Sequence, residues 1–95
     1  MNAKELEKEI QRMDPRFSVV ENANHPKLSN IFFASMNYDL PTIATNDIRE
    51  EVDQSYRYEF PNGMKARFWS RPEILARLEQ FLIDYKAEKY EGMYE

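Results

Sequence analysis

The chain of 95 residues contains no cysteine, two glycines and one histidine. Without cysteine, neither a disulfide framework nor a thiolate metal site can form, which is consistent with a reducing compartment. Two isolated glycines cannot build a phosphate-binding loop or a dinucleotide fingerprint. No apolar run approaches the ~18 residues of a membrane span, and the first residues lack the apolar core of a signal peptide. We therefore expect a cytoplasmic protein with no membrane partner and no cofactor.

The composition is that of a folded chain, with 42% hydrophobic and 14% aromatic residues. This length leaves no room for a second core of ordinary size, so residues 1–95 are expected to form a single domain. The net charge of -4 argues against a whole-molecule affinity for phosphate backbones or anionic lipid. Nucleic-acid binding would therefore need a local basic face.

Helical patterns occupy both ends of the chain. Residues 3–13 place their apolar side chains on one face, with Asn2 as a candidate N-cap and Pro15 ending the helix. Ser70 and Glu73 have the spacing of a capping box, which predicts a second helix from there to about residue 90. Its broad apolar stripe must cover a sheet. The stripe consists of Ile74, Leu75, Leu78, Phe81, Leu82 and Tyr85.

The middle of the chain favours strands. Residues 17–20 are short and rich in β-branched side chains, and residues 28–38 have the apolar character of a central strand. Residues 42–45 fit a brief strand or an extended crossing. Residues 47–54 start with acidic side chains in a pattern that permits a short helix.

A β-hairpin is the clearest pattern, because aromatic and charged residues alternate over 56–60 before the turn at 61–63. A three-residue loop pairs Phe60 with Met64, whereas a two-residue loop would place Phe60 opposite Lys65 and split both faces. We therefore expect the three-residue loop. The inner, core-forming face is then Tyr56, Tyr58, Phe60, Met64, Ala66 and Phe68.

Together these elements predict an α+β fold with a single antiparallel β-sheet of three to five strands. The N-terminal and C-terminal helices are expected to pack on this sheet.

No catalytic or metal-binding constellation is indicated. His25 lies in a loop beside Pro26 without a motif for a nucleophile, so we interpret it as structural. The densest acidic cluster lacks the alternating ligands and central glycine of a calcium loop, and a solvated helix start is the simpler interpretation. That cluster consists of Asp47, Glu50, Glu51 and Asp53. A non-enzymatic protein is therefore expected.

The outer face of the hairpin concentrates positive charge in an otherwise acidic chain. The candidate binding residues there are Arg57, Lys65, Arg67, Trp69 and Arg71. Such a face suits an acidic protein partner, and the alternative is single-stranded nucleic acid stacking on the tryptophan. An ordinary strand face, with the tryptophan under the helix and the arginines paired with acids, explains the same residues.

A second candidate surface is the back of the C-terminal helix, where Ile83, Ala87 and Tyr90 fall opposite the main apolar stripe. Isolated exposed apolar residues are normal, and the alternative is a homodimer or partner contact. The leading functional hypothesis is a small accessory or regulatory protein that binds a partner protein through the hairpin face or this helix face. The alternative is a single-stranded nucleic-acid-binding protein that uses the hairpin face.

Overall fold

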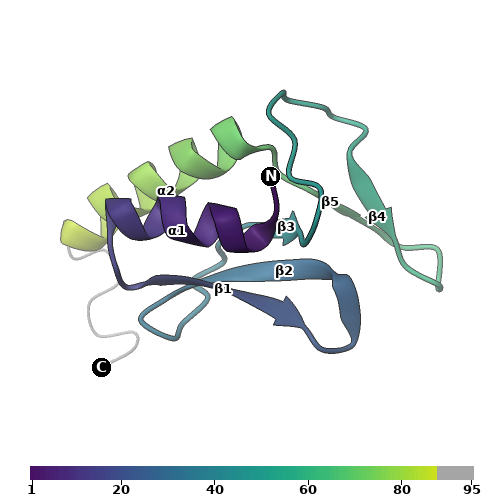
Figure 1. The fold of residues 1–95 in the computed structure, drawn as a ribbon, viewed down its shortest axis with the longest axis horizontal. Coiled ribbons are helices and arrows are strands. Elements are labelled where there is room, and N and C mark those ends of the chain that lie inside the picture. The colour runs from purple at the N-terminus through teal and green to yellow at the C-terminus, as the bar shows by residue number, and fades with distance from the viewer. Residues whose placement is uncertain (88–95) are drawn as a thin grey trace.

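Two helices and two antiparallel sheets make up residues 1–87 of the computed structural model, which are the residues that the structure describes (Figure 1). The α+β class, the antiparallel pairing and the terminal helices were all predicted and are confirmed. The elements are α1 (Ala3–Met13), β1 (Phe17–Asn22), β2 (His25–Phe33), β3 (Thr42–Ala44), β4 (Arg57–Glu59), β5 (Lys65–Arg67) and α2 (Arg71–Lys86).

Helix α1 begins at the predicted cap and lies beside the edge of β1. The Asn2 carboxamide accepts a hydrogen bond from the Glu5 amide at 2.9 Å, and the Glu5 carboxylate accepts one from the Asn2 amide at 3.1 Å. On the strand side, the Val19 amide donates to the Glu7 carboxylate at 2.7 Å. The Glu7 side chain thus binds an amide at the edge of the sheet that would otherwise be available to another strand.

The larger sheet has the order β1-β2-β3, so β2 is the central strand, as predicted. This strand ends at Phe33, earlier than the expected residue 38. Ala34 and Ser35 adopt left-handed backbone angles, with φ of 49° and 70°, and the Phe33 amide donates to the Met36 carbonyl at 2.8 Å. These angles form a tight two-residue turn that the residue types do not signal, since glycine or asparagine is usual there.

Of the two alternatives for residues 42–45, the structure has the brief strand, whereas the short helix considered over 47–54 is wrong. Ile48 is buried in the core, whereas Val52 is 55% exposed and has no apolar surface to pack on. The Asp53 carboxylate accepts hydrogen bonds from the Ser55 amide at 2.9 Å and the Ser55 hydroxyl at 2.6 Å. This local side-chain turn competes with helical hydrogen bonding.

The hairpin has the predicted three-residue loop. Tyr58 pairs with Ala66, and the Phe60 amide donates to the Met64 carbonyl at 2.7 Å. Gly63 takes the left-handed conformation at φ 86° that such a loop requires. The hairpin forms its own two-stranded sheet, which extends from one end of the molecule (Figure 1), so the strands form two antiparallel sheets where a single sheet was expected.

Tyr56 and Phe68 attach the hairpin to the larger sheet by packing on Leu28 of β2 and Ala44 of β3, and all four side chains are buried. The expectation that the whole inner face of the hairpin is core is wrong for Met64, which is 66% exposed. Met64 follows the turn directly and lies outside the cluster formed by these four residues. The aromatic residues nearer the sheet therefore supply the packing.

The main core lies between the helices and the larger sheet, and aromatic rings form one end of it. The Phe33 ring lies 5.0 Å from both Phe17 and Phe81 and 4.9 Å from Tyr85, measured between centroids, in edge-to-face geometry. Helix α2 thus covers the sheet with the predicted stripe. It ends at Lys86 in the described residues, and the expected continuation to about residue 90 lies outside them.

Replacing Phe81 with alanine should lower the free energy of unfolding by about 3 to 5 kcal/mol, because the variant leaves a cavity among packed rings. Urea denaturation followed by circular dichroism would measure this change. Ile83→Ala is the matched control on the same helix, since Ile83 is 61% exposed, and its effect should stay within ~0.5 kcal/mol. Equal losses in the two variants would contradict this account of the core.

Candidate functional site

The five residues predicted to form a basic aromatic face do not come together as one free surface. Arg67 turns toward α2 and forms an ion pair with Glu73, while its guanidinium carbon lies 5.4 Å from the centre of the Trp69 ring. Trp69 is half-buried and packs against the main core. Both side chains are therefore used within the fold.

Arg71 lies at the first turn of α2, away from the hairpin strands. It forms an ion pair with Glu9 of α1, and its second terminal nitrogen lies 3.4 Å from the Glu50 carboxylate. Hydrogen bonding to Glu9 raises the pKa of Arg71 above its ordinary value. This arginine joins the two helices and the loop before the hairpin.

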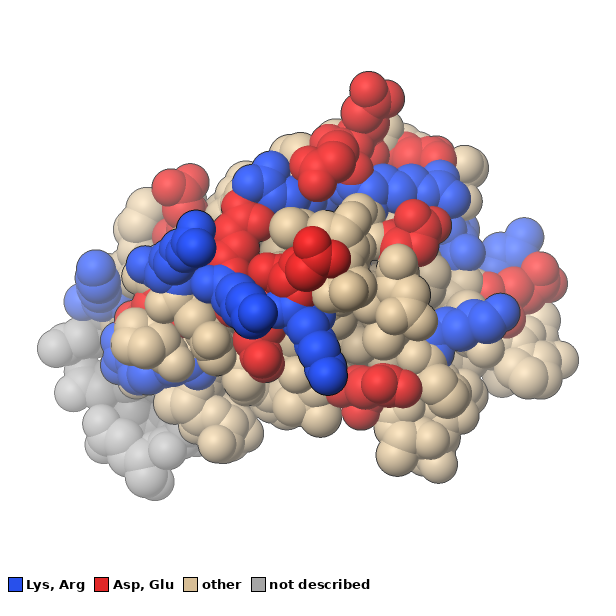
Figure 2. Space-filling view, viewed as in Figure 1, with Lys and Arg blue, Asp and Glu red and all other residues tan. Residues whose placement is uncertain are grey.

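Arg57 and Lys65 are the two predicted cations that make no ion pair of their own, and Glu59 lies opposite Lys65 in the hairpin register. Both side chains are exposed, and within residues 1–87 neither takes part in an ion pair. On the face seen in Figure 2, acidic and basic side chains alternate over the helices and the adjoining loop, so no charge of one sign dominates there.

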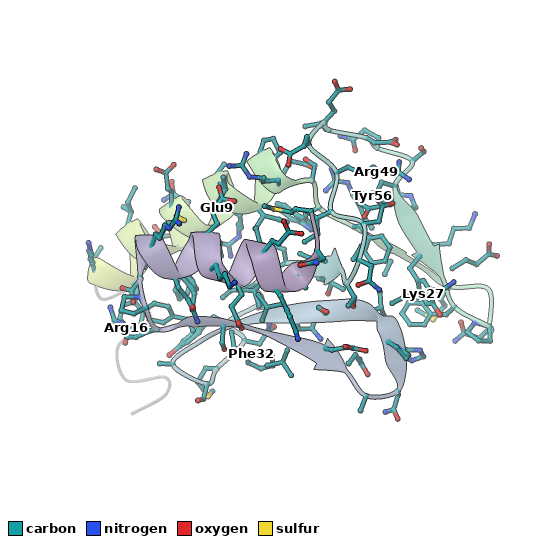
Figure 3. All side chains as sticks on the ribbon, viewed as in Figure 1. Glu9, Arg16, Lys27, Phe32, Arg49 and Tyr56 are labelled. Carbon is teal, nitrogen blue, oxygen red and sulfur yellow. The ribbon has the colours of Figure 1, made fainter. Side chains whose placement is uncertain are left out.

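A cleft of about 490 Å³ lies where the hairpin meets the larger sheet. Its walls come from three segments that are distant in sequence: the beginning of β2, the end of β3 with the following loop, and the hairpin. Figure 3 shows Lys27, Arg49 and Tyr56 at this junction. The lining residues of interest are Lys27, Ala44, Asp47, Arg49, Arg57 and Phe68, together with Tyr56.

Tyr56 carries an unusual polar group for a core position. The residue is only 6% exposed, and its hydroxyl has no hydrogen-bond partner in the part of the chain that the structure describes. Burial, reinforced by the nearby Asp47 carboxylate, raises the pKa of Tyr56 to about 12. The guanidinium carbon of Arg49 lies 4.1 Å from the ring centre, so a cation covers this tyrosine.

Sequence reasoning placed Tyr56 in the core correctly but missed the cleft. Lys27 and Arg49 belong to polar segments with no motif, and only the fold brings them to Arg57. One signal was available: a tyrosine at an inward strand position brings a hydroxyl that needs a partner when it is buried.

The second predicted surface is present in part. Ile83 and Ala87 are exposed at the end of α2, and Tyr90 lies outside the described residues. The exposed isoleucine is therefore the main apolar feature of this helix face.

The remaining candidates have structural roles. His25, expected in a loop, is instead the first residue of β2, and its ring packs at 5.0 Å from Phe60, between centroids. Among the predicted acids, Asp47 and Asp53 form ion pairs with Arg49, with carboxylate oxygens 3.6 and 2.5 Å from its guanidinium nitrogens. No group of three potential ligands that could hold a metal ion occurs in residues 1–87.

In the same range, neither helix has the length and apolar character needed to cross a membrane. No family model matches the chain, and no curated protein or solved structure is significantly similar to it.

The Glu73 carboxylate provides a test of the Arg67 contact through pH. Hydrogen bonding from the Ser70 amide, supported by Arg67, lowers the pKa of Glu73 from its ordinary value of 4.5. Its ionised form therefore stabilises the fold above pH 4.5, and this contribution is lost as the pH falls through the folded-state pKa.

Glu73→Gln keeps a hydrogen-bond acceptor and removes the charge. We expect this variant to be about 1 kcal/mol less stable than the parent at pH 7, with the difference shrinking steadily below pH 4.5. Urea denaturation across this pH range would measure the change. Glu79→Gln, exposed on the same helix, is the control, and an identical pH profile for both variants would rule out the assigned role of Glu73.

Proposed function

We propose that the chain is a small non-enzymatic protein-interaction module that binds an acidic partner through the exposed side of the hairpin. The observation that carries this proposal is that Arg57 and Lys65 are exposed and, within residues 1–87, form no ion pair, in a chain of net charge -4. Met64, directly beside Lys65, adds an apolar side chain that is 66% exposed. An exposed methionine suits a protein partner, because Met is enriched in interfaces, as is Arg.

The state of Trp69 favours a protein over single-stranded nucleic acid. Base stacking needs a ring face that is open to the ligand, whereas Trp69 packs against the core and Arg67 lies over its ring. Arg67 and Arg71 already bind carboxylates, which leaves Arg57 and Lys65 as the cations of the predicted set that form no ion pair within residues 1–87. Two charges give a weak phosphate-binding surface but are sufficient for steering an acidic protein.

A non-enzymatic role is supported by the surroundings of the histidine. The His25 ring lies among the aromatic rings of Tyr58 and Phe60, at 6.3 and 5.0 Å between centroids, and within residues 1–87 no carboxylate pairs with it. A general base normally needs such a partner. As a regulatory or accessory protein, the chain would act by occupying its partner's surface.

Site-specific photo-cross-linking tests the proposal. A photoreactive phenylalanine derivative is placed at Met64, at Ile83 or at the control position Val52, which is 55% exposed in the loop before the hairpin. In native extract, the Met64 probe should capture a protein at least ~10-fold more strongly than the Val52 probe. Adding Arg57→Gln and Lys65→Gln should lower that yield by ~10-fold or more, equivalent to ~1.4 kcal/mol of binding free energy.

The alternatives predict different products. Capture from Ile83 alone would move the interface to the back of α2, with a second copy of the chain as the product if that face forms a dimer. A product that is degraded by nuclease would replace the protein partner with nucleic acid. Equal capture from Met64 and Val52 would refute the proposal.

A further inference from the structure

The cleft between the hairpin and the larger sheet has the size and lining of a small-molecule site. Its volume of about 490 Å³ falls within the range of ~300 to 1,000 Å³ that is typical of ligand pockets. Ala44 and Phe68 contribute apolar wall, while Tyr56 contributes both a ring and a hydroxyl. Such a mixture of apolar surface and a few polar groups favours a compact organic ligand.

The charge of the lining is opposite to that of the whole chain. Three basic residues, Lys27, Arg49 and Arg57, line the cleft with a single acidic residue, Asp47. Arg49 is held by carboxylates of the same loop, but neither Lys27 nor Arg57 forms an ion pair within residues 1–87. An anionic ligand therefore finds two uncompensated cations there, in a molecule whose net charge is -4.

The buried hydroxyl of Tyr56 provides an independent observation. A buried polar group without a hydrogen bond costs about 1 to 3 kcal/mol of stability, so its presence needs an explanation. Phenylalanine would fill the same space without this cost. Because the pKa of Tyr56 is raised to about 12, the group stays protonated near neutral pH and is a hydrogen-bond donor.

We propose that this cleft binds a small organic anion, whose acidic group lies between Lys27 and Arg57 and accepts a hydrogen bond from the Tyr56 hydroxyl. The anionic group is a carboxylate or a phosphate, and the apolar body of the ligand packs against Phe68 and Ala44. The ligand would thus bridge the two sheets. This inference goes beyond the proposed function and does not depend on it.

Arg49 controls access to the hydroxyl. Its guanidinium lies over the Tyr56 ring, and its side chain is itself 44% exposed. A ligand reaches the hydroxyl by displacing this side chain, which can keep its contact with Asp53 at the surface. Arg49 then covers the bound anion from the solvent side and adds a third positive charge.

Three related compounds serve as probes: phenyl phosphate, benzoate and phenol. They share a planar ring and differ in the charged group, so phenol controls for ring binding alone. Titration of the full chain at pH 7, followed by proton–nitrogen NMR, should give saturable shifts at the amides of Ala44, Ser55 and Tyr56 with one or both acids. The acid that binds more tightly identifies the preferred anionic group. Raising the salt concentration should weaken the binding of both acids.

Single substitutions separate the contributions. Tyr56→Phe should keep or raise the melting temperature and weaken acid binding by about 3- to 10-fold, the value of one hydrogen bond. Lys27→Gln and Arg57→Gln should each weaken it by ~5-fold or more. Lys65→Gln is the matched control, because it removes a hairpin cation that lies outside the cleft lining, and it should leave acid binding unchanged.

The proposal fails if neither acid gives saturable shifts up to ~10 mM, or if phenol shifts the same amides as strongly as the acids. It also fails if Tyr56→Phe leaves the acid affinity unchanged, which would mean that the hydroxyl binds water only. The same variants keep the two proposals distinct. Tyr56→Phe should preserve cross-linking from Met64, and Lys65→Gln should weaken cross-linking while preserving acid binding.

Discussion

The packing of Tyr56 and Phe68 on Leu28 and Ala44 joins the hairpin to the larger sheet. A two-stranded hairpin is marginally stable by itself in water, so the position of β4 and β5 depends on this contact. The same contact creates the cleft, because the hairpin meets the sheet at one end and leaves open space beside it. Arg57, which is exposed on the hairpin, lies where it also lines the cleft. Loss of these four side chains from the cluster would remove both candidate binding features.

A like-charge pair in the hairpin accounts for the ion pair between Arg67 of β5 and Glu73 of α2. The register places Arg57 opposite Arg67, an arrangement that destabilises a strand pair unless a negative charge is near. Glu73 provides that charge for Arg67, and the same carboxylate accepts hydrogen bonds from the Ser70 amide and hydroxyl at 3.0 and 2.8 Å. One side chain thus caps the helix and neutralises one of the two arginines, whereas Arg57 forms no ion pair within residues 1–87.

Local patterns predicted much of the fold, as the two helix starts and the hairpin register illustrate. Asn2 and Ser70 cap helices because capping depends on residues three positions apart, and the register follows from keeping apolar residues on one face. One predicted element was wrong. The helix expected over 47–54 is absent because Ile48 alone reaches the core, and the side chain of Asp53 makes a turn instead.

The candidate site was predictable only in part, because some of its residues are placed by strand alternation and others by contacts between distant segments. Arg57 and Lys65 were identified because strand alternation places them on the outer face, whereas the ion pairs of Arg67 and Arg71 depend on where α2 and α1 lie. Lys27 and Arg49 come from separate polar segments that carry no motif.

The sequence by itself determined the two terminal helices, their caps and the pairing within the hairpin, because each depends on residues that are close along the chain. Only the tertiary structure decided that Trp69 packs inward, that two of the basic residues are neutralised by acids, and that the Tyr56 hydroxyl, beside a cationic cleft, has no partner within residues 1–87. These outcomes depend on the docking of the hairpin against the sheet and of α2 against α1. Contacts between distant segments, unlike helix caps and strand alternation, leave no periodic pattern in the sequence.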